Sequence, residues 1–121
     1  MTIVVGNVVR AFTTKAAGKG PTPKFHLCVC DQEWHFLFVS KNQYPNDYPL
    51  SNVECEGLER ATSWLSLSPV LHVPKMRRYE TVCTVSHEYL RGLYKFAQAS
   101  KVMSPVDKRK VLTGIARKLG D

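Results

Sequence analysis

The first two thirds of the chain alternate between apolar and polar residues with the period of β-strands. Residues 2–12 predict one strand that bends at Gly6, and residues 24–30 and 35–40 predict two more strands around the turn "DQEW". The strand 24–30 presents two faces, one with Phe25, Leu27 and Val29 and the other with His26, Cys28 and Cys30.

The segments around these strands carry turn-forming residues. Residues 13–23, "TTKAAGKGPTP", predict a loop, and residues 41–63 predict a long excursion with a short strand or turn inside it. Residues 63–74 are strand-like, and Pro69 either breaks this strand or marks a sheet edge. Residues 78–85 predict a short final strand or extended connector.

After residue 85 the apolar period changes to that of a helix. Residues 86–100 place Leu90, Leu93, Tyr94 and Ala97 on one stripe, with Ser86 as the capping residue. Residues 104–120 predict a second helix.

This second helix carries its own start and stop signals. Ser104 is its cap, Pro105 is its first residue and Gly120 ends it. Its apolar stripe consists of Val111, Leu112, Ile115 and Leu119.

Strands followed by helices predict an α+β fold, in which a small antiparallel sheet or barrel precedes two C-terminal helices. The chain has 121 residues, which suits one domain over 1–121, with a β part over 1–85 and a helical part over 86–121. No apolar run is long enough to span a membrane, and the N-terminus lacks the features of a signal peptide. We therefore expect a cytoplasmic protein.

The charge is unevenly distributed. The formal net charge is +7, residues 1–30 contain no Asp or Glu, residues 31–60 are acidic, and the C-terminal residues are basic again. This pattern indicates either a polyanionic or an acidic protein partner, or simply a solvated basic surface.

The four cysteines are Cys28, Cys30, Cys55 and Cys83. In a cytoplasmic protein all four are expected to be reduced. Cys28 and Cys30 share a strand face and cannot bridge each other, and the spacing of the four residues does not suit zinc. We expect buried thiols and no metal or cofactor.

The open end of the predicted hairpin collects polar residues. With "DQEW" as the turn, His26 pairs near Val39 and Lys24 near Lys41, or one residue away from these partners. Lys24, Ser40 and Lys41 then lie together with His26, and the adjacent loop adds two cations, Lys15 and Lys19. Cations this close favour a bound anion such as phosphate. The alternatives are a core imidazole for His26 and an edge charge for Lys24.

Several aromatic residues also bear on nucleic-acid binding. Phe36 and Phe38 are expected in the core, whereas Trp34, Tyr44 and Tyr48 lie in predicted turns or loops. Aromatic residues in loops either stack on unpaired bases or anchor the loop.

These motifs together resemble the MazF/PemK family of toxin endoribonucleases. "GNVV" at 6–9 is similar to the family's opening "GD" followed by two apolar residues, and "GKGPTPKFHLCVC" at 18–30 occupies the place of its Gly/Lys-rich loop and following strand. "SLSPVLHVPKMRR" at 66–78 and "CTVSHEYL" at 83–90 resemble its later strand and helix start. The resemblance spans most of residues 4–97 and implies an SH3-like barrel with helices behind it.

The resemblance also implies metal-independent cleavage of single-stranded RNA, in which the ribose 2′-hydroxyl attacks the neighbouring phosphorus. Lys24 takes the position of the family's Arg, Ser40 that of its Thr, and His26 could transfer the proton; "Lys24-Phe25" replaces the family's Arg-Pro. Lys15, Lys19 and Lys41, with Arg77 and Arg78, would bind the RNA. A homodimer and an acidic antitoxin are implied as well.

Two other functions fit the same fold. The first is a non-catalytic binding module, such as a regulator derived from a phage or mobile element, that binds nucleic acid or a nucleic-acid-processing protein. The missing Arg-Pro pair favours it. The second is a structural partner that docks through its two helices, with Tyr89, Leu93 and Phe96 in the interface rather than packed on the barrel.

Overall fold

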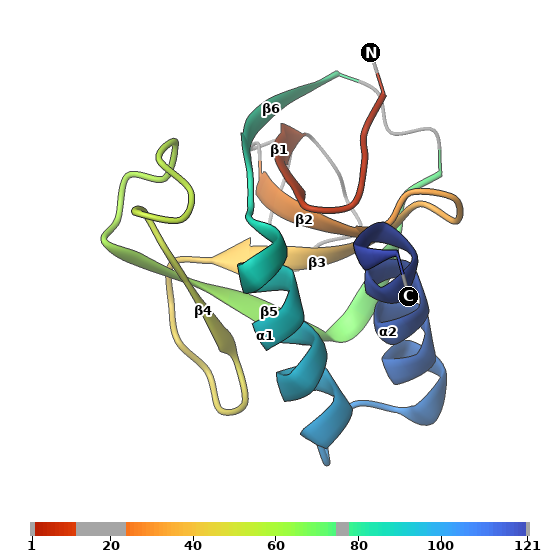
Figure 1. Ribbon diagram of the computed structural model, residues 1–121. Helices are drawn as coiled ribbons and strands as arrows, with labels where there is room; N and C mark the ends of the chain where they lie inside the picture. The colour runs from red at the N-terminus through yellow and green to blue at the C-terminus, as the bar shows by residue number, and fades with distance from the viewer. Residues whose placement is uncertain (1, 12–23, 75–77, 121) are drawn as a thin grey trace.

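Six antiparallel strands form one curled, half-barrel sheet, and two C-terminal helices pack against it (Figure 1). This computed structural model describes residues 2–11, 24–74 and 78–120. The elements are β1 (Asn7–Ala11), β2 (Lys24–Cys30), β3 (His35–Ser40), β4 (Tyr48–Ser51), β5 (Thr62–His72), β6 (Tyr79–Thr84), α1 (His87–Ala99) and α2 (Pro105–Leu119). The predicted α+β class, with a small barrel-like sheet followed by two helices, is confirmed. In the described ranges, no helix combines the length and the apolar character that crossing a bilayer requires.

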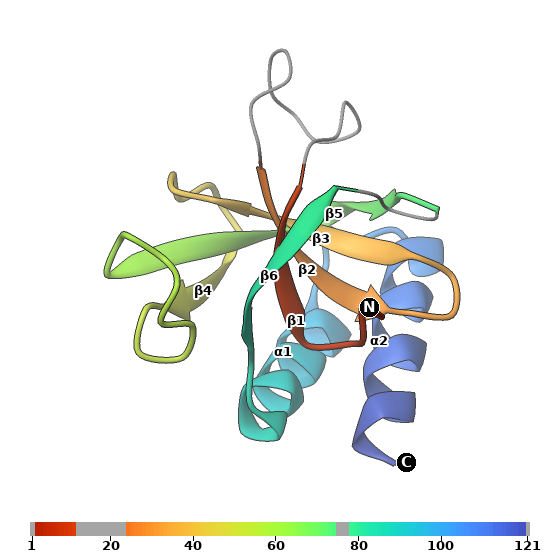
Figure 2. The ribbon, with the colours of Figure 1, turned by 90° about the horizontal axis from the view of Figure 1, so that it is seen from above.

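The strands lie in the order β4-β5-β3-β2-β1-β6, so β4 and β6 are the two edges (Figure 2). The excursion predicted over 41–63 contains the edge strand β4. Pro69 does not end β5, because this strand runs on to His72. Since β4 pairs only with residues 62–65 of β5, Pro69 lies beyond the end of β4, where that side of β5 forms the sheet edge among the described residues. The ladder of β5 to β3 is irregular between Phe36 and Phe38, where the longer strand accommodates extra residues.

One face of the sheet carries the helices. On this helix-side face the ring of Tyr48 packs against Tyr89 and Phe96 of α1, with ring centroids 5.5 and 4.9 Å away. Leu93 is fully buried, and Phe96 is 37% exposed. All three residues considered for a docking interface therefore pack inward, and Phe96 in addition lies partly at the surface.

Local capping explains where both helices begin. The side chain of Ser86 accepts a hydrogen bond from Tyr89 N, and that of Ser104 accepts one from Asp107 N. Gly120 closes α2 with a φ of 85°, a left-handed conformation that glycine adopts without strain. The predicted caps are confirmed.

A disulfide joins Cys55 to Cys83, so the prediction that all four cysteines are reduced is wrong. Cys55 lies in the β4–β5 connection and Cys83 in β6, and the curl of the sheet brings these two edges together. The pair is 28 residues apart in sequence, a separation that no local pattern reveals. Cys28 and Cys30 are free and buried, which confirms that they do not bridge each other.

Candidate functional site

A bulge in the β2–β3 hairpin determines which residues meet at its open end. Next to the turn, Cys30 pairs with His35 as predicted. The register then shifts between Cys28 and Cys30, so that His26 pairs with Phe38 and Phe25 with Val39. Continued by one residue beyond Phe25 and Val39, the same register sets Lys24 opposite Ser40 rather than Lys41. This continuation makes Lys24 and Ser40 neighbours across the hairpin, by way of a one-residue shift.

Lys24 and Ser40 belong to a row of side chains that crosses five strands at one end of the sheet. Ala11 pairs with Lys24 and with Tyr79, and Ser40 pairs with Trp64. The row therefore runs Trp64, Ser40, Lys24, Ala11, Tyr79 on the face opposite the helices. Apart from the buried Ala11, its side chains are partly exposed. We call this set the Lys24 row.

The two polar residues at its centre have groups suited to an anion. The hydroxyl oxygen of Ser40 accepts a hydrogen bond from Asn42 N over 3.1 Å, which leaves the hydroxyl proton to donate. Lys24 contributes an ammonium group with three donors on a flexible side chain. A phosphate oxygen between them would receive bonds from both residues.

His26 lies beneath this row and is fully buried. Its Nδ1 donates a hydrogen bond to the carbonyl oxygen of Lys24 over 3.1 Å, and its ring packs edge-on against Phe36 and Phe38. Nε2 is buried without a hydrogen-bond partner among the described residues. Burial lowers the pKa of His26 to about 4, which keeps the ring neutral. This environment fits the core-imidazole alternative, because such a ring does not reach a phosphate at the surface.

Two further predicted RNA-binding cations lie at the same end of the sheet. Lys41 is exposed and directly follows Ser40, and Arg78 is exposed and directly precedes Tyr79. Lys15, Lys19 and Arg77 lie outside the described residues. Of the predicted RNA-binding cations, the structure therefore describes Lys24, Lys41 and Arg78 at this end.

The aromatic residues fall into two groups. Tyr48 is in β4 rather than a loop, and both it and Trp34 pack against the core. Tyr44 is 59% exposed in the β3–β4 connection. Trp64, beside Ser40, is a residue that the sequence reasoning missed. Its signal was present, since Leu65 and Leu67 alternate with Trp64 and Ser66 and must occupy the opposite face.

The other described histidines and the cysteines do not come together as a metal-binding centre. His35 and His72 pair across β3 and β5, and Nδ1 of His72 donates to the carbonyl oxygen of Glu33 over 3.0 Å. Within 2–11, 24–74 and 78–120, no group of three or more His, Cys, Asp or Glu side chains is arranged to hold a metal ion. A pocket is present, but it lies at the turn end of the hairpin, away from the Lys24 row.

No protein-family model matches the chain, and no curated protein sequence matches it. The resemblance to MazF/PemK toxins therefore rests on the sequence motifs alone.

Proposed function

We propose that the Lys24 row binds the backbone of single-stranded RNA. The observation that carries this proposal is the position of Lys24 opposite Ser40, which places an ammonium and a hydroxyl donor side by side at a partly exposed sheet end. Lys41 and Arg78 add positive charge on either side of this pair. Cations and hydroxyl groups are the side chains that most often contact nucleic-acid phosphates.

The aromatic residues of the row favour an unpaired strand over a duplex. Trp64 neighbours Ser40 and Tyr79 lies two strands from Lys24, so that both rings flank the phosphate-binding pair. Bases stack on aromatic side chains only when they are not buried in a double helix. We therefore favour the non-catalytic binding module of the two leading hypotheses.

Cleavage by a MazF/PemK-like mechanism is the second candidate. Lys24 and Ser40 are juxtaposed, as the resemblance requires of residues that hold the scissile phosphate. In this reaction the 2′-oxygen forms a bond to phosphorus as the bond to the 5′-oxygen breaks, and a base must accept the 2′-hydroxyl proton. The burial of His26 removes the base that the sequence suggested, which is why we rank binding above cleavage.

Fluorescence anisotropy with a labelled single-stranded RNA tests binding. We expect the affinity to fall steeply as the salt concentration rises, because cations that contact phosphates carry the binding. Lys24→Ala should weaken binding about tenfold, because it removes one of these cations. Lys24→Arg should retain most of the affinity. Lys101→Ala, an exposed cation in the connection between the helices, is the matched control. Equal affinities for Lys24→Ala and Lys101→Ala would refute the proposal.

Gel analysis of the same RNA after incubation with protein and EDTA tests cleavage. Products that end in a 2′,3′-cyclic phosphate, and that disappear with Lys24→Ala and with Ser40→Ala, would establish the toxin-type reaction. Intact RNA over a wide range of protein concentration would refute cleavage, and binding would be the one proposed function that remains.

The proposed cleavage function carries three further proposals: an acidic antitoxin, a homodimer and a cytoplasmic location. The basic sheet end would bind the antitoxin by charge complementarity. The Cys55–Cys83 disulfide is unusual for the cytoplasm, where thiols are kept reduced. Alkylation of free thiols in intact cells, followed by mass spectrometry, measures whether this disulfide exists in the compartment where the protein acts.

A further inference from the structure

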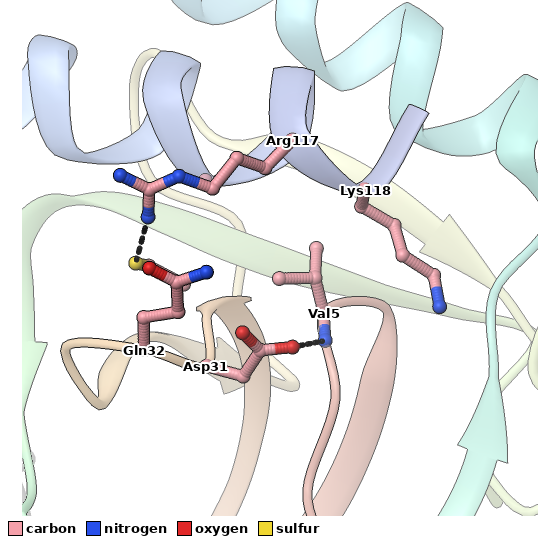
Figure 3. A pocket seen from close by; sticks show the side chains of 7 residues that line it. Val5, Asp31, Gln32, Arg117 and Lys118 are labelled. Carbon is pink, nitrogen blue, oxygen red and sulfur yellow. Dashed lines mark hydrogen bonds between the residues drawn. The ribbon is translucent and has the colours of Figure 1, made fainter. Parts of the chain in front are cut away.

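A half-open pocket of about 250 Å³ lies between the β2–β3 turn and the C-terminal half of α2 (Figure 3). It is at the opposite end of the hairpin from the Lys24 row, so its role is independent of RNA binding. Its floor is formed by Val5, Cys30 and Gly114, and its polar rim by Asp31, Gln32, Arg117 and Lys118.

The floor owes its shape to the close approach of α2 and β2. A Cβ atom on Gly114 would overlap the carbonyl oxygen of Val29, so only glycine permits this packing. The space beside Gly114 is lined by the apolar side chain of Val5 and the buried thiol of Cys30. The volume is below that of pockets for drug-sized molecules, which indicates a ligand of a few heavy atoms.

Hydrogen-bond donors dominate the α2 side of the rim. Arg117 Nη1 points at the Sγ atom of Cys30 over 4.0 Å (Figure 3). A thiol sulfur is a weak acceptor, so this contact leaves most of the guanidinium donors for a ligand. Lys118 extends from the next position of α2, and the Gln32 amide faces Arg117 from the turn.

Asp31 supplies an acceptor on the other side. Its Oδ2 accepts a hydrogen bond from Val5 N over 3.2 Å, which fixes the carboxylate at the pocket wall. Its Oδ1 is then oriented to accept a bond from a molecule in the pocket (Figure 3). The rim thus combines two cations with one carboxylate.

We propose that this pocket binds a small carboxylate that carries a neighbouring hydrogen-bond donor, the group shared by α-hydroxy and α-amino acids. The ligand carboxylate pairs with the Arg117 guanidinium, whose fork matches two carboxylate oxygens. The adjacent hydroxyl or ammonium group donates to Asp31. A phosphate dianion is disfavoured, because it brings two charges next to the Asp31 carboxylate.

NMR titration of the isotopically labelled full chain tests this proposal. We expect L-alanine or L-lactate to shift the amide resonances of Val5, Gln32 and Lys118 with a Kd of about 1 mM. The difference between the two compounds identifies ammonium or hydroxyl as the donor. Acetate lacks the donor, and ethanolamine lacks the carboxylate, so both should bind at least about tenfold more weakly.

Substitutions then assign the shifts to the pocket. Arg117→Ala should weaken binding about tenfold, and Gln32→Ala about threefold. Arg109→Ala, an exposed arginine of the same helix outside the pocket, should leave binding unchanged. Both rim residues are exposed, so these variants are expected to fold.

Two results would overturn the proposal. One is the absence of shifts with alanine and lactate. The other is shifts of equal size with acetate or phosphate, or in Arg117→Ala. In either case Arg117 and Lys118 serve only to stabilise the negative end of the α2 dipole.

Discussion

Burial decides what each polar residue of the β2–β3 hairpin can do. Lys24 and His26 share one strand face, two residues apart, but Lys24 is partly exposed and His26 is fully buried. The imidazole donates to the Lys24 carbonyl and thereby fixes the start of β2. His26 is therefore a positioning residue for Lys24, rather than a group that exchanges protons with a ligand.

The buried His26 predicts a loss of stability in mild acid. Burial lowers its pKa from 6.5 to about 4, so between these pH values the unfolded chain binds a proton that the native protein does not. The free energy of unfolding should therefore decrease as the pH falls from about 6.5, by about 3 kcal/mol at pH 4 from this residue. Burial also lowers the pKa of His35, which adds to the decrease.

Urea unfolding between pH 7 and 4.5 measures this effect. His26→Gln should flatten the pH dependence, because glutamine does not titrate, while the contribution of His35 remains. His87→Gln is the control, since His87 is exposed at the start of α1. If His26→Gln and the wild type lose stability equally over this range, the imidazole is not buried in the neutral form.

At the scale of single elements, one bulge and one glycine position the two sites. The bulge between Cys28 and Cys30 shifts the register of the rest of the hairpin by one residue. The residue opposite Lys24 is therefore Ser40 instead of the predicted Lys41. Gly114 lets α2 lie directly on β2, next to the pocket. Each feature depends on a single residue and has consequences along a whole element.

Gly114→Ala should destabilise the protein although alanine is the better helix former. The propensity gain is about 1 kcal/mol, but the new methyl group overlaps the Val29 carbonyl oxygen, and the backbone there cannot move independently of the sheet. We expect a net loss of about 2 kcal/mol in the free energy of unfolding, measured with urea.

The neighbouring Thr113→Ala provides the comparison, because Thr113 is an exposed residue of the same helix. It should change the stability by less than about 0.5 kcal/mol. A Gly114→Ala protein more stable than the wild type would show that α2 does not lie this close to β2.

At the scale of the whole molecule, the disulfide closes the half-barrel. It ties the β4–β5 connection to β6, the strand at the other edge of the sheet. Glu54, next to Cys55, adds to this closure by accepting hydrogen bonds from the backbone N–H and the hydroxyl of Ser86. The start of α1 is therefore held by the same segment that bridges the sheet edges.

Reduction of this bond should lower the stability of the entire fold. For a closed loop with a sequence separation of 28, the chain-entropy model gives a loss of about 3–4 kcal/mol. Thermal unfolding with and without a reducing agent should show this as a lower Tm. In Cys55→Ser/Cys83→Ser the reducing agent should have no effect. A wild-type Tm that is the same under both conditions would contradict a role of the disulfide in stability.

Much of the architecture could be read from the sequence because it depends on local rules. The change from a two-residue to a helical apolar period predicted strands before helices, and Ser86, Ser104 and Gly120 marked the helix ends. These signals arise from neighbouring residues and need no knowledge of the fold. The polar character of the open hairpin end was equally visible.

Tertiary structure decided the rest, because the relevant partners are distant along the chain. The burial of His26, the row that joins Trp64 to Ser40 and Lys24, and the Cys55–Cys83 bond all depend on how the sheet curls and pairs. The pocket likewise forms only where the C-terminal helix reaches the β2–β3 turn. The sequence by itself determined which elements form; the packing of those elements determined which side chains stay accessible to a ligand.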